Sequence, residues 1–85
     1  MIVILTMPNC QNCSALATLI ESLRMDDKVV WDNASDHMDL CRKFNIRHVP
    51  AVLVYNRAAD QDPVRVITDT AEINDYLNEV KRNDK

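Results

Sequence analysis

The chain has 85 residues, of which 47% are hydrophobic and 27% charged, and this composition predicts one small globular domain covering residues 1–85. A net charge of −3, with Lys and Arg scattered, argues against nucleic-acid binding. No apolar run approaches the roughly 20 residues of a membrane span, and the apolar N-terminal stretch lacks the basic leader of a signal peptide, so we expect no membrane association.

The first predicted elements are a short β-branched strand at residues 2–5, a turn at residues 7–9 and a helix at residues 11–24. The segment Cys10-Gln11-Asn12-Cys13 is a CxxC pair at the opening of this helix. Two thiols one helical turn apart can close into a disulfide, and the start of a helix is where a thiol ionises most easily. The pair therefore indicates redox chemistry rather than a structural crosslink.

A second strand is predicted at residues 28–32, where Trp31 is interpreted as a core residue. A second helix, capped by Asn33 or Ser35, is expected to run through about residue 44. Its inward-facing side chains are expected to be Met38, Cys41 and Phe44. Cys41 is accordingly interpreted as a buried, inert thiol.

The C-terminal half predicts a strand at residues 51–55, a polar loop, an edge strand at residues 63–67 and a last helix from Asp69 or Thr70. Asp69 and Glu72 resemble a capping box. The predicted order is β-α-β-α-β-β-α, an α/β fold with a four-stranded mixed sheet. The first two strands should be parallel, the last two should form a hairpin, and helices should cover both faces.

Two features of composition add further expectations. Three cysteines are an odd number and too few for a disulfide scaffold, which favours a reducing compartment and a cytoplasmic location. Glycine is absent, so residues with positive φ must be of other types. Asn45 and Asn56 are the expected positions, because asparagine adopts this conformation at low cost.

The element order, the CxxC after the first strand and Val49-Pro50 before the third together resemble the thioredoxin fold, and more narrowly its small glutaredoxin and glutaredoxin-like thioredoxin branch. The resemblance implies that Cys10 is the exposed nucleophile and Cys13 the buried resolving thiol. The residues agree, since Cys13 shares a helix face with apolar side chains and Cys10 does not. Pro50 is expected to be cis, which sets the Val49 backbone opposite the disulfide.

The activity implied by this resemblance is reduction of protein disulfides by a monomeric thiol–disulfide oxidoreductase without a bound cofactor or metal. Electrons are expected from NADPH through thioredoxin reductase or, alternatively, from glutathione, and a ribonucleotide reductase is one acceptor the family suggests. The catalytic residues are then Cys10 and Cys13. The substrate-binding residues are expected to be His48, Val49, Pro50 and Thr68.

The chain departs from the glutaredoxin pattern at the positions that hold glutathione. Met7 replaces a basic residue before the CxxC, Gln11-Asn12 replaces an aromatic-containing pair, and residues 68–71 replace a Gly-Gly-x-Asp run. Asp69 is expected to repel an anionic tripeptide. These departures favour thioredoxin reductase over glutathione as the source of electrons.

Other interpretations remain open at the level of sequence. His37 and Cys41, four residues apart on the second helix, would complete a zinc site with the CxxC pair if the fold brought them together. His48 is either a neighbour of Cys10 or a solvated loop residue. A further alternative is a redox-idle module of the same fold that uses its Val49-Pro50 face to bind a partner.

Overall fold

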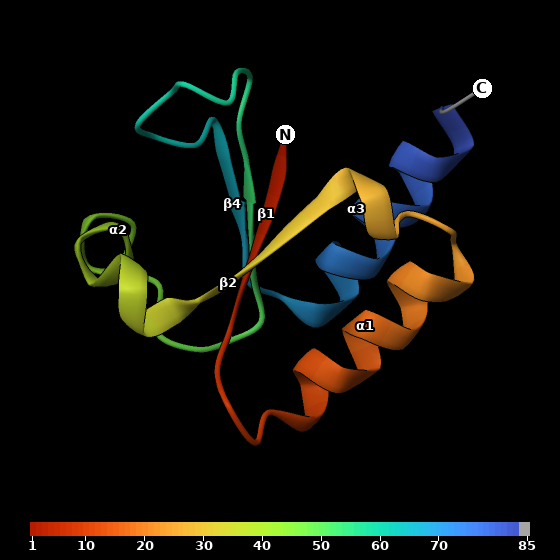
Figure 1. Ribbon diagram of the computed structural model, residues 1–85, viewed down its shortest axis with the longest axis horizontal. Coiled ribbons are helices and arrows are strands. Elements are labelled where there is room, and N and C mark those ends of the chain that lie inside the picture. The colour runs from red at the N-terminus through yellow and green to blue at the C-terminus, as the bar shows by residue number, and fades with distance from the viewer. Residues whose placement is uncertain (84–85) are drawn as a thin grey trace.

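The computed structural model describes residues 1–83 and shows an α/β arrangement of three α-helices and a four-stranded mixed sheet (Figure 1). The elements are β1 (Ile2–Thr6), α1 (Gln11–Ser22), β2 (Val29–Asn33), α2 (Met38–Lys43), β3 (Ala51–Val54), β4 (Arg65–Ile67) and α3 (Thr70–Asn83). Two short 3₁₀ helices, Asp26–Lys28 and Ala34–His37, precede β2 and α2. The predicted order of elements is therefore confirmed.

The sheet has the strand order β2-β1-β3-β4. β1 and β2 are parallel and β3 and β4 antiparallel, as expected from the helical connection and the hairpin. β3 also pairs antiparallel with β1, which was not predicted. Ile4 of β1 pairs with Trp31 of β2 on one side and with Val52 of β3 on the other. Because paired residues project from the same face, Trp31 lies on the face of the sheet to which Ile4 belongs.

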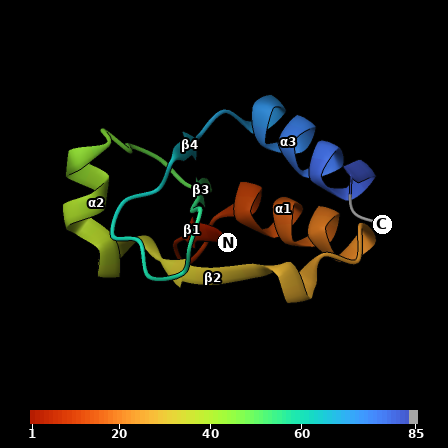
Figure 2. The same cartoon turned by 90° about the horizontal axis from the view of Figure 1, so that it is seen from above.

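Helices cover both faces of the sheet, with α1 and α3 on one side and α2 on the other (Figure 2). Alternate residues of β1 therefore enter different cores. Ile4 packs with Ile20 of α1 and Leu77 of α3, whereas Leu5 packs on the α2 side with Leu53. Burial on both faces explains why β1 reads as a continuous apolar run rather than an alternating one.

The ends of α1 and α2 show how the chain turns without glycine. Arg24 follows α1 with a φ of 57°, and its N–H and that of Met25 donate to the carbonyls of Glu21 and Ile20. These are the two hydrogen bonds of a Schellman motif. Asn45 repeats the motif after α2 with a φ of 55°.

The prediction of positive φ is thus confirmed for Asn45 and wrong for Asn56. Within the described residues, the other left-handed positions are Arg24 and Asn9, the latter with a φ of 62°. Asn56 follows β3 in a loop of several residues, where the chain reverses without a left-handed residue at that position. A helix end or a tight turn demands positive φ more strictly than a long loop does.

The second helical segment differs from its prediction. Asn33 caps it, since its Oδ1 accepts a hydrogen bond of 2.9 Å from the Ser35 N–H, but residues 34–37 form a 3₁₀ helix and the α-helix begins only at Met38. A 3₁₀ turn has three residues instead of 3.6, which rotates the following side chains relative to a continuous α-helix. Met38 is consequently 50% exposed rather than directed inward.

Other element boundaries also shift. α1 ends at Ser22, and β4 begins at Arg65 because Pro63 has no N–H to donate to the sheet. The predicted cap of α3 is present, since Asp69 Oδ2 accepts a 3.1 Å hydrogen bond from the Glu72 N–H. Among residues 1–83, no helix has both the length and the apolarity that a membrane crossing requires.

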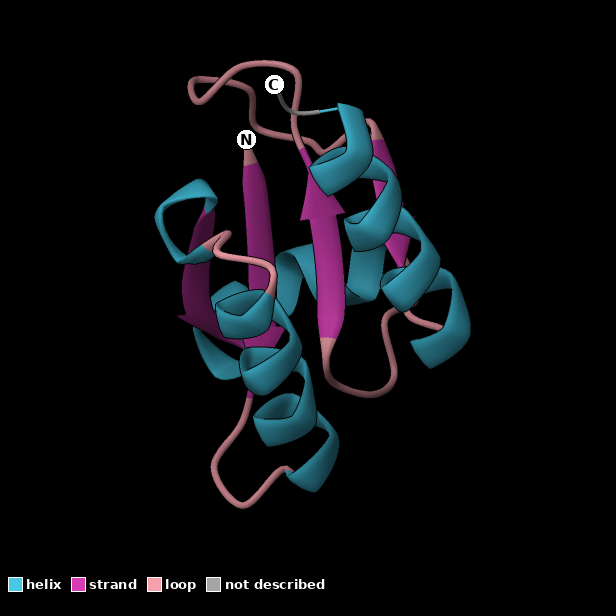
Figure 3. Ribbon diagram, turned by 90° about the vertical axis from the view of Figure 1, so that its right-hand side faces the viewer, coloured by secondary structure: helices cyan, strands magenta, loops and turns pink. Residues whose placement is uncertain are grey.

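The loop from β1 to α1 projects from the end of the sheet opposite Met1 (Figure 1). The view onto α1 and α3 shows the same loop at the bottom, where the chain leaves β1 and enters α1 (Figure 3). Cys10 lies at the end of this loop, immediately before α1. The fold therefore presents the CxxC segment at one edge of the molecule.

Candidate active site

Cys10 and Cys13 form a disulfide at the start of α1. Cys10 is the N-cap residue, with an extended backbone (φ −98°, ψ 107°), and Cys13 lies in the first helical turn with a Cα–Cα separation of 5.2 Å. This local geometry is a direct consequence of CxxC spacing at a helix start, because one turn brings the two side chains to the same side. The predicted pairing is confirmed.

The two sulfurs have different surroundings. Cys13 is only 8% exposed and lies on the buried face of α1 with Leu16 and Ile20, whereas Cys10 is half-buried at the surface. A reagent approaching from solvent therefore meets Cys10 before Cys13. This asymmetry matches the roles of nucleophile and resolving thiol that the resemblance implies.

The helix start supplies polar contacts to Cys10. The Cys13 N–H donates a 3.0 Å hydrogen bond to Cys10 Sγ, so the sulfur occupies the place that a Ser or Asp side chain usually takes at an N-cap. The carbonyl oxygen of Cys10 accepts hydrogen bonds from the Ser14 N–H at 3.2 Å and the Ser14 hydroxyl at 3.4 Å. A helix N-terminal N–H that donates to a sulfur stabilises the thiolate form of that sulfur once the disulfide is reduced.

The Val49–Pro50 peptide bond is cis, as expected, and lies beside the disulfide. Cys10 Sγ is 3.9 Å from the Val49 carbonyl oxygen, although the two residues are 39 positions apart in the sequence. Pro50 is buried and Val49 half-buried, directly before β3. The predicted placement of the Val49 backbone opposite Cys10 is therefore present in the fold.

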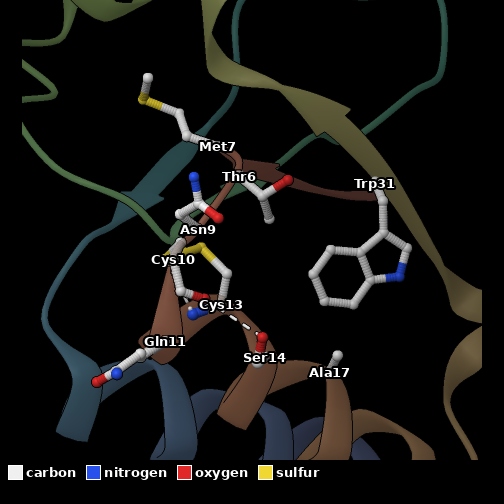
Figure 4. A pocket seen from close by; sticks show the side chains of 9 residues that line it. All are labelled: Thr6, Met7, Asn9, Cys10, Gln11, Cys13, Ser14, Ala17 and Trp31. Atoms are coloured by element: carbon white, nitrogen blue, oxygen red, sulfur yellow. Dashed lines mark hydrogen bonds between the residues drawn. A yellow bond between two sulfur atoms is a disulfide. The ribbon is translucent and has the colours of Figure 1, made fainter.

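Two hollows flank Cys10. The first has a volume of about 670 Å³ and lies between β2 and α1 (Figure 4). Its lining consists of uncharged residues: Thr6, Met7, Asn9, Cys10, Gln11, Cys13, Ser14, Ala17 and Trp31. The hollow thus offers the disulfide a neutral neighbourhood of polar and apolar side chains.

The second hollow, of about 540 Å³, lies toward α2 and the Val49 loop. It is lined by Met7, Pro8, Asn9, Cys10, Ala34, Ser35, Met38, Cys41, Ile46, Arg47, His48 and Val49. Arg47 and His48 line this hollow, and the remaining side chains are mainly apolar. His48 is exposed and shares this hollow with Cys10, so it is both solvated and close to the site.

Thr68, predicted to bind substrate, lies outside the two hollows that contain Cys10. It is half-buried in the short connection between β4 and α3. A separate, smaller hollow between α1 and α3 contains Thr70 together with Pro50. Thr70, at the first position of α3, therefore shares a hollow with the cis-proline.

The interpretation of Trp31 as a core residue is wrong. Its side chain is 38% exposed, and Figure 4 shows the indole beside the first hollow, across from Cys13 and Ala17. β2 is an edge strand of the sheet, and α1 faces the indole with small side chains that include Ser14 and Ala17. The ring is therefore left at the surface beside the CxxC segment instead of beneath a helix.

Cys41 and His37 do not complete a metal site with the CxxC pair. His37 Nε2 lies 3.1 Å from Asp32 Oδ2, and Cys41 Sγ lies 4.0 Å from the Ala34 carbonyl oxygen. Within residues 1–83, no three His, Cys, Asp or Glu side chains gather as ligands of one ion would. Cys41 is half-buried rather than fully buried, and its position in the second hollow was not expected.

The sequence thus predicted the disulfide pair and the Val49–Pro50 segment but did not predict that Trp31, Met38 and Ile46 line the hollows beside Cys10. The arrangement supplies a disulfide with one accessible sulfur, a backbone carbonyl beside it and two hollows able to receive flanking groups.

In comparisons with known proteins, no protein-family model and no curated protein matches the chain.

Proposed function

We propose that the protein is a thiol–disulfide oxidoreductase of the thioredoxin fold, in its small glutaredoxin-like branch, that reduces disulfides in other proteins. The observation that carries this proposal is the asymmetric Cys10–Cys13 disulfide at the N-terminus of α1, facing the cis Val49–Pro50 bond. A structural crosslink would not need an accessible sulfur, a helix N–H aimed at it and a buried partner.

In the proposed reaction the reduced protein donates two electrons. The Cys10 thiolate bonds to one sulfur of the target disulfide, and the other target sulfur leaves and takes a proton from water. Cys13 then loses its proton and attacks Cys10 Sγ, which forms the Cys10–Cys13 disulfide and releases the second target sulfur as a thiol. The buried position of Cys13 beside Cys10 favours this intramolecular step over attack by an external thiol.

The second hollow supports binding of a polypeptide substrate. The Val49 carbonyl lies 3.9 Å from Cys10 Sγ, so an extended segment carrying the target cysteine is placed beside an available backbone acceptor. The apolar side chains of Met38, Ile46 and Val49 line the hollow next to it. Met38 is half exposed, as expected of a residue that gains burial on binding.

For regeneration of the dithiol we propose NADPH and a flavoenzyme of the thioredoxin reductase class, with glutathione as the alternative. Glutathione carries two carboxylates, and the hollow between β2 and α1 has no charged residue in its lining to bind them. Asp69 caps α3 directly before Thr70, which lines the smaller hollow together with Pro50. The uncharged lining of the hollow between β2 and α1 therefore favours a protein reductant, whereas an anion that entered the second hollow would meet Arg47 and His48.

The test is consumption of NADPH by thioredoxin reductase with insulin as the disulfide substrate and no glutathione. Wild-type protein should support turnover, and Cys10→Ser should reduce it to the background rate because the attacking sulfur is lost. Ser22→Ala, at the far end of α1, serves as the control and should behave as wild type. Turnover that persists in Cys10→Ser would contradict the assigned nucleophile.

If wild-type protein shows no turnover with thioredoxin reductase, the same assay with glutathione and glutathione reductase tests the alternative source of electrons. Failure in both systems, with a disulfide that cannot be reduced by dithiothreitol in the folded protein, would overturn the proposed activity.

A further inference from the structure

Trp31 occupies a position that core packing does not explain. It is the one tryptophan of the chain, stands on the edge strand β2 and remains 38% exposed. Its register partner Ile4 is fully buried under α1 and α3, whereas the indole projects beyond them toward the CxxC segment. A large aromatic side chain left at the surface beside a reactive group is a candidate contact for a binding partner.

The hollow in front of Trp31 has a defined chemistry. None of its lining residues is charged, and Cys10 and Cys13 are both among them. The two hydroxyls of the lining already face backbone acceptors: Thr6 Oγ1 lies 3.4 Å from the Asp32 carbonyl oxygen, and Ser14 Oγ lies 3.4 Å from that of Cys10. The hollow therefore suits an uncharged group that gains by stacking against the indole rather than by ion pairing.

The position of the hollow relates it to a substrate. It meets the hollow that contains Val49 at Met7, Asn9 and Cys10, which line both. One residue of extended chain spans roughly 3.3–3.6 Å, so a segment joined to Cys10 by its cysteine sulfur reaches both hollows with its nearest neighbouring residues. A side chain adjacent to the target cysteine would thus be delivered to Trp31.

We propose that Trp31 is a specificity-determining residue that contacts the substrate and selects protein disulfides flanked by an uncharged aromatic or aliphatic side chain. This inference rests on the proposed dithiol exchange through Cys10 and Cys13, and it names the class of polypeptide segment which that site prefers. Glutathione, with its two carboxylates, is disfavoured by the same hollow because no cationic group lines it.

The experiment measures single-turnover reduction of small disulfides by the pre-reduced protein, without any reductase. Three oxidants are compared: the disulfide dimers of capped Ser-Phe-Cys-Phe-Ser and Ser-Ser-Cys-Ser-Ser peptides, and hydroxyethyl disulfide. The variants are Trp31→Ala, Trp31→Phe and Val30→Ala. Val30 is the matched control, because it neighbours Trp31, is 44% exposed and projects from the opposite face of β2.

We expect Trp31→Ala to lower the rate constant for the Phe-containing peptide about tenfold, a loss typical of truncating an aromatic anchor. Its rates with the Ser-containing peptide and with hydroxyethyl disulfide should stay within about twofold of wild type, since these substrates place no large side chain on the indole. Trp31→Phe should recover most of the loss. Val30→Ala should match wild type with all three oxidants.

Equal rates for wild type and Trp31→Ala with the Phe-containing peptide would overturn the role of Trp31. So would an equal slowing with all three oxidants, because Trp31 would then act on the dithiol itself. If wild-type protein reduces none of the oxidants, including hydroxyethyl disulfide, the failure belongs to the proposed exchange reaction, and the specificity falls with it.

Discussion

At the scale of single residues, the chain gives two cysteines of one motif opposite environments. The sequence predicts this for Cys13, which lies at helical spacing from Leu16 and Ile20, and the structure confirms it. The exposure of Trp31 could not be predicted from spacing in the same way. Its strand and face follow from alternation, but its exposure depends on how far α1 extends sideways over an edge strand, which is a non-local property.

The tyrosines give a prediction at this scale. Burial is the main cause that raises the pKa of both Tyr55 and Tyr76, with the charge of Asp62 adding to it at Tyr55 and Arg65 opposing it at Tyr76. A pKa that is higher in the folded state means that the unfolded chain ionises first, so this contribution to stability is complete below pH 10 and is lost as pH rises through the folded pKa values.

The measurement is the urea midpoint of unfolding between pH 8 and pH 12, compared with a Tyr55→Phe/Tyr76→Phe double variant. The wild-type midpoint should fall more steeply above pH 10 than that of the variant, which has no phenol to ionise at either position. Parallel curves for the two proteins would show that these phenols do not couple to folding.

At the scale of elements, the observed helix ends agree with the predicted ones where a capping side chain marks them. They differ where the chain forms a 3₁₀ turn instead of an α-helical one. Asp69 caps α3 as its pattern with Glu72 indicates. The segment after Asn33 begins with a 3₁₀ turn, which no spacing in the sequence distinguishes from an α-helix and which turns Met38 outward. The hollow beside Cys10 therefore contains a side chain that was expected in the core.

The Schellman motif after α1 allows a direct test. Arg24 adopts a φ of 57°, a conformation that costs a residue with a Cβ about 1–2 kcal/mol and costs glycine little. Arg24→Gly should therefore raise the free energy of unfolding, by about 0.5–1 kcal/mol after the larger entropy of an unfolded glycine is subtracted. Arg24→Ala retains the Cβ and is the control, with no gain expected.

Urea denaturation of the three proteins measures the difference, and a glycine variant no more stable than the alanine variant would contradict this account of the helix end.

At the scale of the whole molecule, a sheet covered on both faces holds the parts of the site in place. β1 ends directly before the CxxC loop and its two faces enter separate cores, while the adjacent β3 begins directly after Val49–Pro50. Antiparallel pairing of β1 and β3 thus brings together segments 39 positions apart, with Cys10 Sγ at 3.9 Å from the Val49 carbonyl. The order of elements along the chain, the parallel β1–β2 pair and the β3–β4 hairpin could be predicted from the sequence, whereas the central β1–β3 pairing was not. The two hollows could not be predicted, because their shapes depend on side chains from four separate segments.

The central claim is that Cys10 exchanges with external disulfides and that Cys13 resolves the product, and trapping tests it most directly. Reduced Cys13→Ser and Cys10→Ser proteins are incubated separately with insulin, quenched with acid and analysed by mass spectrometry under non-reducing conditions. Cys13→Ser should accumulate a mixed disulfide through Cys10, because the sulfur that releases the target is missing. Cys10→Ser should trap little, since Cys13 is buried. Equal trapping by both variants, or trapping by Cys10→Ser alone, would contradict the assigned roles.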